Sequence, residues 1–294
     1  FSGHGDPGLI AHAPHDIYRA RQSVFVKTVL HPRTAEPCLV GPVETTHLFL
    51  GRNCAKIIHR VSQCNLIIDQ FFADHALGIE RHEVRIIHGD RLHLQAPGMA
   101  AISCAIKPSA DTCEATVWKD TLIVDKTDTD INQWLSSYLD SSVQLVRYGT
   151  QSHRQVDLQH TQTAQPVAFA DAFPLLVTHQ ASLEQLNTQL SQAVGMERFR
   201  PNVVVSSDQP AWQELQWQQL GSAEVIIEVA KPCVRCVMTG VDQSQGEQTG
   251  SEVLKTLKQK FPYQDQAVFG INGIAQTTHN KTVTLAVGQK LTVQ

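Results

Sequence analysis

The feature of this sequence that most constrains its fold is a series of short apolar segments separated by close turns. From residue 83 to residue 94, apolar and polar side chains alternate on both sides of a turn at residues 88–91, which predicts a β-hairpin. Further strands are expected over residues 101–106, 115–118, 121–124, 143–147, 174–177, 203–205, 224–229, 282–287 and 291–293. Short strands with close turns favour a β-barrel or a sandwich, so the chain is predicted to be mainly β.

A few helices are expected among these strands, which gives a predicted fold class of α+β in which β dominates. Residues 131–138 form a short helix candidate, with Asp130 placed as its N-cap. Residues 183–193 form a clearer candidate, because leucines recur three and four positions apart on one face. There, Ser182 and a glutamine three positions later have the spacing of a capping box. A last short helix is predicted over residues 252–258.

The length of 294 residues is more than one compact core needs and suits two domains. Residues 148–166 are polar and lack periodic apolar positions, so they are interpreted as a linker or an exposed loop. The predicted division is a β-barrel-like domain over residues 1–150 and a second β-barrel domain over residues 151–294. Residues 1–85 give weak signals and are interpreted as divergent, and the irregular spacing of their histidines argues against a metal site there.

Charge and composition argue against several classes of function. The formal net charge is −4, so the chain lacks the basic excess that binds a nucleic-acid backbone. No run of 18 apolar residues occurs, which argues against a helix that spans a membrane. Seven cysteines are an odd and sparse set, unlike a disulfide scaffold, and they favour a reducing, cytoplasmic compartment.

The densest candidate site is the segment KPCVRCVMTGVD, which covers residues 231–242 and follows an apolar strand. Cys233 and Cys236 have C-x-x-C spacing, and Arg235 lies between them. Because a neighbouring cation stabilises thiolate over thiol, either sulfur is a candidate nucleophile or a ligand for a thiophilic metal. Three alternatives stay open: a zinc knuckle, for which two nearby ligands are missing, a thioredoxin-like pair, and two buried cysteines at a strand end.

Other segments surround this motif in a specific order. They are FADAFPLLVTHQASL at 169–183, FRPN at 199–202, Thr239 and Asp242 after the cysteines, EVLKTLK at 252–258 and FGIN at 269–272. Over residues 165–294 this order resembles the MOSC domain family, which includes molybdenum cofactor sulfurases and amidoxime-reducing proteins. The segment GDRLHLQAPGM at 89–99 resembles the β-barrel that precedes this domain in the amidoxime-reducing branch. Two N-terminal turn motifs of that branch do not occur in this sequence; Phe25-Val26-Lys27-Thr28 is a distant likeness of one.

The resemblance implies a molybdenum cofactor, a pterin dithiolene in which one protein cysteine binds the metal. Cys236 matches that metal ligand and is a catalytic candidate, as is Asp242, whose carboxylate would orient substrate, relay a proton or cap a turn. Arg200, Asn202 and Thr239 match positions that bind the cofactor. A guanidinium suits the pterin phosphate and a carboxamide suits a heterocycle, with a surface salt bridge and a turn as the alternatives.

The resemblance also implies an activity, that of a molybdenum-dependent oxidoreductase that reduces N-hydroxylated compounds such as amidoximes and hydroxylamino-purines. No four-cysteine iron–sulfur motif is present, so electrons are expected from a separate ferredoxin-like protein or flavin reductase. Pyridoxal phosphate binding is a further property that the wider family implies. Two other hypotheses are a non-catalytic carrier of the cofactor or of sulfur, and an inactive remnant. Cys233 is interpreted as a packing residue and Arg235 as a structural cation.

Overall fold

The computed structural model describes fourteen segments of the chain, separated by gaps. They are residues 9–12, 28–30, 46–47, 55–61, 64–67, 83–87, 91–96, 98–105, 108–138, 142–161, 164–242, 247–277, 283–285 and 288–294. The segments Val24–Val26 and Leu48–Leu50, two apolar runs of the N-terminal part, lie outside these residues, as does most of the Phe25–Thr28 likeness.

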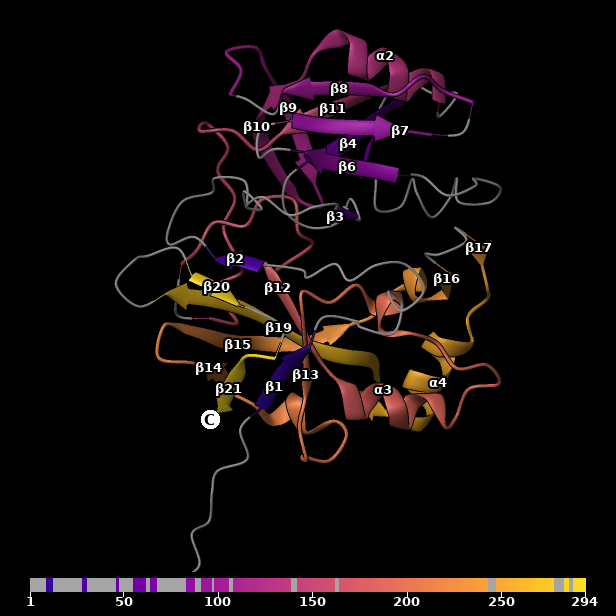
Figure 1. The fold of residues 1–294 in the computed structure, drawn as a ribbon, viewed down its shortest axis with the longest axis vertical. Coiled ribbons are helices and arrows are strands. Elements are labelled where there is room, and N and C mark those ends of the chain that lie inside the picture. The colour runs from indigo at the N-terminus through magenta and orange to yellow at the C-terminus, as the bar shows by residue number, and fades with distance from the viewer. Residues whose placement is uncertain are drawn as a thin grey trace, which may run out of the picture.

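The largest sheet has eight strands and combines the C-terminal strands with one strand from the start of the chain (Figure 1). Its order is β12 (Leu175–His179), β13 (Val203–Ser206), β1 (Leu9–His12), β21 (Lys290–Val293), β14 (Gln219–Gly221), β15 (Val225–Val234), β19 (Gln266–Thr277) and β18 (Pro262–Tyr263). Because β12 also pairs with β19, seven of these strands form a closed ring of pairings. Two short pairs accompany this ring: β2 (Thr28–Leu30) with β20 (Val283–Leu285), and β16 (Val241–Asp242) with β17 (Glu247–Gln248).

The strands of the ring bury alternate apolar side chains in one cluster. Leu220, Ile227 and Ile271 are fully buried there, and each such side chain contributes about 1.5–3 kcal/mol to folding. The ring closes tightly at Gly270, whose φ is +74° and where a Cβ atom would lie 2.6 Å from the carbonyl oxygen of Val177. The glycine of the FGIN segment is therefore required by the close approach of β19 to β12.

Two helices cover one side of the ring. α3 (Gln180–Asn187) and α4 (Glu252–Lys260) contribute Leu186 and Leu257 to a second apolar cluster. Phe269 of β19 lies in the same cluster and stacks on Phe199, with ring centroids 3.7 Å apart. This cluster fixes the short 3-10 helix η1 (Met196–Phe199) against the helices, and η1 leads into the FRPN segment.

The strands between residues 46 and 147 form two smaller sheets, above the ring in Figure 1. The five-stranded sheet has the order β5 (Cys64–Ile67), β4 (Ala55–Val61), β11 (Val143–Arg147), β10 (Asp120–Lys126), β9 (Thr112–Val117). The four-stranded sheet has the order β3 (Thr46–His47), β6 (Glu83–Ile87), β7 (Arg91–Gln95), β8 (Ile102–Ala105), and it contains the predicted hairpin. The prediction of a mainly β fold with a few helices is confirmed.

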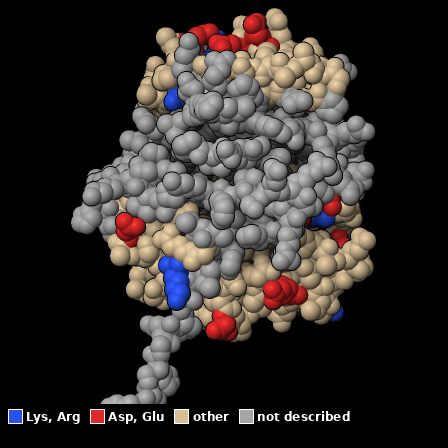
Figure 2. Space-filling view, in the orientation of Figure 1, with Lys and Arg blue, Asp and Glu red and all other residues tan. Residues whose placement is uncertain are grey.

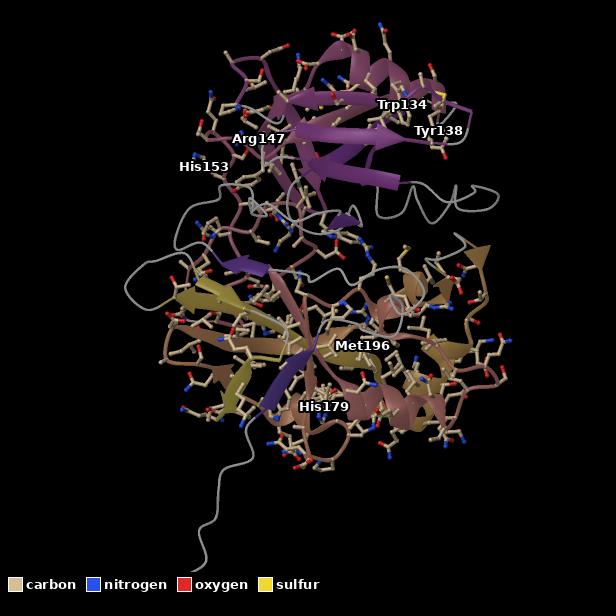
Figure 3. All side chains as sticks on the ribbon, in the orientation of Figure 1. Trp134, Tyr138, Arg147, His153, His179 and Met196 are labelled. Atoms are coloured by element: carbon tan, nitrogen blue, oxygen red, sulfur yellow. The ribbon has the colours of Figure 1, made fainter. Side chains whose placement is uncertain are left out.

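Two of the predicted helix starts are wrong. α2 (Thr129–Tyr138) begins before Asp130, which therefore lies in its first turn instead of capping it. α3 begins at Gln180 and its N-cap position is His179, so Ser182 lies inside the helix. The Ser182 hydroxyl donates to the buried Glu214 carboxylate at 2.8 Å, and this long-range bond is what the capping-box pattern could not reveal. Figure 3 shows His179 at the helix side of the ring.

The predicted linker over residues 148–166 is partly buried, which corrects the expectation of an exposed loop. Arg154 is buried and its Nε donates to Asp120 at 2.8 Å. Its two Nη groups donate to three backbone carbonyls, those of Ala168, Ala170 and Asp171. A polar sequence therefore packs here because one guanidinium satisfies several buried acceptors.

The described surface carries charges of both signs. Figure 2 shows acidic side chains at the top of one face, and both acidic and basic side chains in its lower part. Inside the five-stranded sheet, Arg147 forms a buried ion pair with Asp125 at 2.8 Å, and Figure 3 shows Arg147 in this upper part. Within the described residues, no helix is both long and apolar enough to cross a membrane.

Candidate functional site

Cys236 lies where β15 ends and a single 3-10 turn, η3 (Val237–Gly240), begins. The backbone N–H of Arg235 donates to the Ala267 carbonyl at 2.8 Å, so the chain is still attached to β19 immediately before the cysteine. The N–H and the hydroxyl of Thr239 both donate to the Cys236 carbonyl, at 3.2 and 3.1 Å. Cys236 is exposed, whereas Cys233 is buried, so the Cys236 thiol is the accessible sulfur of the C-x-x-C pair.

Arg235 connects this turn to the end of η1. One of its Nη groups donates to the Phe199 carbonyl at 2.9 Å, and the other donates to the Cys233 sulfur at 3.0 Å. Its guanidinium also lies over the Phe199 ring, 5.7 Å from the ring centroid. The interpretation of Arg235 as a structural cation thus agrees with its contacts, and Cys233 is both a packing residue and a hydrogen-bond acceptor.

Arg198 makes a second connection between η1 and the segment after Cys236. Its side chain is buried, and Nη2 approaches the Asp242 carboxylate at 3.4 Å. Its Nη1 donates to the Thr249 hydroxyl at 2.6 Å. Asp242, predicted as catalytic, is therefore held beside a buried guanidinium on the strand that follows η3.

Arg200 and Asn202 flank the proline of the FRPN segment. Arg200 ends η1 with a φ of +54°, in the left-handed region that non-glycine residues rarely adopt and that is often found at functional sites. The side-chain oxygen of Asn202 accepts a hydrogen bond from the Leu176 backbone N–H at 2.8 Å. The backbone N–H of Asn202 donates to the Leu176 carbonyl at 2.9 Å. Asn202 thus attaches this segment to β12.

The residues around Cys236 carry donors of the kinds that a pterin-bound metal needs. An exposed cysteine offers a soft sulfur ligand, and three arginines at positions 198, 200 and 235 stand on the two connected segments. In the described part of the chain, the Nε atoms of Arg198 and Arg235 are buried without a hydrogen-bond partner. An anionic cofactor that contains a thiophilic metal requires a soft sulfur ligand and guanidinium N–H donors. Cys236 and the three arginines provide both, so these residues fit the group.

Glu197 is the acidic residue beside this arrangement that the sequence analysis missed. Burial raises the pKa of its carboxyl above the ordinary value, and Asp242 adds to this; Arg198 and backbone N–H groups act in the opposite direction. Its carboxylate folds back over Gly195, where a Cβ atom would lie 2.1 Å from Oε2. Oε2 is buried without a hydrogen-bond partner in the described structure.

The raised pKa of Glu197 predicts a pH dependence of stability. A folded-state pKa above the unfolded value stabilises the fold fully at pH values below the unfolded pKa, and this contribution is lost as pH rises through the folded pKa. Glu197→Gln is therefore expected to be more stable than the parent at pH 7, by roughly 0.5 kcal/mol, and to lose this advantage towards pH 4. Urea unfolding at the two pH values measures the difference, and an equal difference at both would contradict the assignment.

The structure brings most of the predicted residues to two neighbouring segments. Cys236, Thr239 and Asp242 follow β15, while Arg200 and Asn202 follow η1, and the two arginine connections join these segments. The sequence analysis missed Arg198, Glu197 and Thr249. Arg198 could have been found from the sequence, because it directly precedes the FRPN segment. Nothing in the sequence around Thr249 indicated its role, because its hydrogen-bond partners Arg198 and Gly240 are 51 and nine residues away. Among the described residues, no group of three or more metal-binding side chains occurs, so nothing there favours the zinc knuckle.

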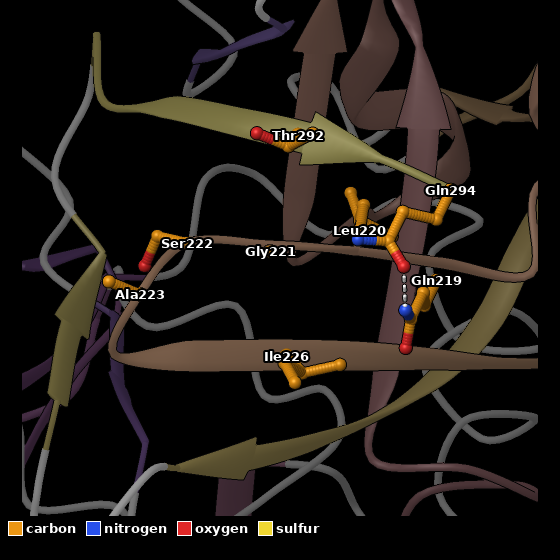
Figure 4. Close-up of a pocket in the computed structure, with 8 residues that line it drawn as sticks. All are labelled: Gln219, Leu220, Gly221, Ser222, Ala223, Ile226, Thr292 and Gln294. Atoms are coloured by element: carbon orange, nitrogen blue, oxygen red, sulfur yellow. Dashed lines mark hydrogen bonds between the residues drawn. The ribbon is translucent and has the colours of Figure 1, made fainter.

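A separate cavity lies at the opposite end of β15. It has a volume of about 280 Å³ and is shown in Figure 4. Its lining residues are Gln219, Leu220, Gly221, Ser222, Ala223, Ile226, Thr292 and Gln294. Ile226 is the second residue of β15 and Cys236 lies two residues beyond the last, which places them on the order of 30 Å apart along the strand. The cavity is therefore not part of the cysteine site.

Comparison with known proteins shows to which family the chain belongs. The family model for the MOSC domain matches residues 164–292. Mitochondrial amidoxime reducing component 2 of Rattus norvegicus is 30% identical over 255 residues, which cover 79% of this chain and 73% of the relative. The chain belongs to the MOSC domain family, in its amidoxime-reducing branch.

Two further relatives match over shorter lengths. Mitochondrial amidoxime-reducing component 1 of Mus musculus is 37% identical over 134 residues, 44% of this chain and 39% of the relative. The human component 1 is 32% identical over 130 residues, 43% of this chain and 38% of the relative. For each of these two relatives, the chain matches less than half of the relative's length.

Proposed function

We propose that this MOSC protein is a molybdenum-cofactor-dependent reductase of N-hydroxylated compounds. The observation that carries the proposal is an exposed Cys236 thiol, whose segment is held by hydrogen bonds from Arg235 and Arg198 next to the segment that contains Arg198 and Arg200. The relatives named as amidoxime-reducing components support it, because they include one that aligns with most of this chain. A mainly polar, cation-rich site with one soft ligand also agrees with a bound, anionic metal cofactor.

Four residues of the two segments are proposed to bind the cofactor. Cys236 binds the metal through its sulfur, and Arg200 donates N–H groups to the anionic end of the cofactor. Asn202 and Thr239 are proposed to bind the cofactor as well, and their hydrogen bonds to Leu176 and to the Cys236 carbonyl hold the two segments in shape. When bound, the cofactor would supply the two-electron redox chemistry that the reduction requires.

Asp242 is proposed to handle protons. Reduction of an N–OH group breaks the N–O bond, consumes two electrons and two protons, and releases water. A carboxylate beside a buried guanidinium, as in the Asp242–Arg198 pair, can hold a proton-donating water or the substrate N–OH in place. Electrons would come from a separate redox protein, of the ferredoxin-like or flavin-reductase type.

Location and a second cofactor remain predictions. The relatives are named mitochondrial, whereas the cysteine content of this chain predicted a cytoplasmic compartment. Pyridoxal phosphate binding, implied for the wider family, has no observation in its favour within the described site.

The division into domains at residue 150 stays a proposal. The strand β1, from residues 9–12, pairs with β13 and β21 of the C-terminal ring.

A second candidate function uses the same thiol. Because Cys236 is exposed, its sulfur is also open to carry the cofactor or a transferable sulfur without turnover. The two functions differ in one assay. The purified MOSC protein, produced in cells that make the cofactor, is mixed with a chemical electron donor and benzamidoxime. Formation of benzamidine at a rate above that of cofactor-free protein supports the reductase; bound molybdenum without turnover supports the carrier.

A further inference from the structure

The Cys236 turn and the segment before Arg200 are joined by hydrogen bonds that run in opposite directions. Arg198 reaches from η1 to Thr249, at 2.6 Å, beyond the turn. Arg235 reaches from the start of the turn back to the Phe199 carbonyl, at 2.9 Å. The thiol at position 236 and the guanidinium at position 200 therefore stand on two segments whose separation depends on both arginines.

Thr249 is the central residue of the first connection. Its hydroxyl accepts from Arg198 and donates to the Gly240 carbonyl at 2.9 Å. Its backbone N–H donates to the same carbonyl at 2.7 Å. Gly240 is the last residue of η3, and a Cβ atom there would lie 2.1 Å from the Gly250 carbonyl oxygen, so the two segments are already in close contact. The far end of the Cys236 turn is thus attached to Arg198 through the Thr249 hydroxyl, and the longer contact of Arg198 with Asp242, at 3.4 Å, lies two residues further along.

The turn itself has little internal support. A 3-10 helix of four residues has weak hydrogen-bond geometry, and η3 has no side-chain cap at its start. Its position relative to Arg200 must therefore come from bonds to other segments. Arg200 in turn has an unusual backbone conformation directly after η1, the segment to which Arg198 belongs.

We propose that Thr249 is a positioning residue: through its hydroxyl, Arg198 holds the Cys236 turn at the separation from Arg200 that lets the thiolate and the guanidinium bind one cofactor. This inference rests on the proposed function, since it concerns the molybdenum cofactor. It assigns no chemical step to Thr249, which acts only through Gly240 and Arg198.

The test compares two substitutions at position 249. Thr249→Val keeps the size of the side chain and removes the hydroxyl; Thr249→Ser keeps the hydroxyl. Thr127→Val is the matched control, because Thr127 also donates its hydroxyl to a backbone carbonyl, that of Leu145 at 2.8 Å, in the five-stranded sheet. All proteins are produced in cofactor-making cells, and molybdenum per protein is measured before and after dialysis, together with the Mo(V) electron paramagnetic resonance spectrum.

Of the variants at positions 249 and 127, only Thr249→Val is expected to lose molybdenum. Thr249→Val should retain molybdenum about 10- to 100-fold less well than the parent, as is typical for loss of a residue that orients a metal ligand. The fraction that stays loaded should give an altered spectrum, while Thr249→Ser and Thr127→Val match the parent. Arg198→Lys, which keeps the charge but not the forked geometry, should repeat the loss if Thr249→Val folds poorly.

Three outcomes overturn the proposal and are distinguishable. If the parent holds molybdenum and Thr249→Val holds it equally well with the same spectrum, the positioning role is wrong and the proposed function stands. If Thr249→Ser loses the metal as Thr249→Val does, the hydroxyl is not the determinant. A parent without molybdenum removes both the proposed function and this inference.

Discussion

Cys236→Ala is expected to abolish molybdenum binding. The loss of affinity should exceed about 100-fold, because loss of a residue that only orients a metal ligand already costs about 10- to 100-fold. The reason is that Cys236 carries the exposed sulfur of the C-x-x-C pair, whereas Cys233 is buried against Arg235. No other described thiol stands on the arginine-connected segments. Elemental analysis of protein from cofactor-making cells, before and after dialysis, measures the loss.

The control for this experiment is Cys113→Ala. Cys113 is partly buried in β9 of the five-stranded sheet, so its replacement removes a thiol of the same chemistry from another part of the MOSC protein. It should leave the molybdenum content unchanged. Equal metal in the parent and in Cys236→Ala would contradict the assignment of this cysteine, and Cys233→Ala would then show whether the buried sulfur is the ligand.

The largest expected loss of stability comes from Arg154→Ala. This side chain is buried, pairs with Asp120 at 2.8 Å and donates to the carbonyls of Ala168, Ala170 and Asp171. Its removal leaves three backbone acceptors and one partly exposed carboxylate without their donor. Because each buried acceptor left unsatisfied costs about 1–3 kcal/mol, the expected total is about 3 kcal/mol or more. Urea unfolding followed by circular dichroism measures the change in the free energy of unfolding.

Lys126→Ala is the matched control for Arg154→Ala. Lys126 forms an ion pair of similar length with Asp111, 2.9 Å, but both side chains are substantially exposed to solvent. Such a pair contributes at most about 1 kcal/mol. If the two substitutions lowered the free energy of unfolding equally, the burial and multiple hydrogen bonds of Arg154 would not be what stabilises the 148–166 connection.

Local patterns in the sequence were enough for much of the fold. The alternation over residues 83–94 predicted the β6–β7 hairpin, and apolar runs predicted β11, β13 and α4 close to their observed bounds. These elements depend on side-chain period and turn residues within a few positions, which a single sequence displays directly. The C-x-x-C segment and the FRPN segment likewise pointed to the parts of the chain that form the site.

The tertiary structure alone decided which residues meet. It placed Leu9–His12 between β13 and β21, made Ser182 a partner of Glu214 instead of a cap, and buried Arg154 inside a polar connection. It also joined Arg198 to Thr249, 51 residues later. The physical reason is common to all four: each depends on hydrogen bonds between distant segments, whose partners are set by how the sheets close and not by local periodicity.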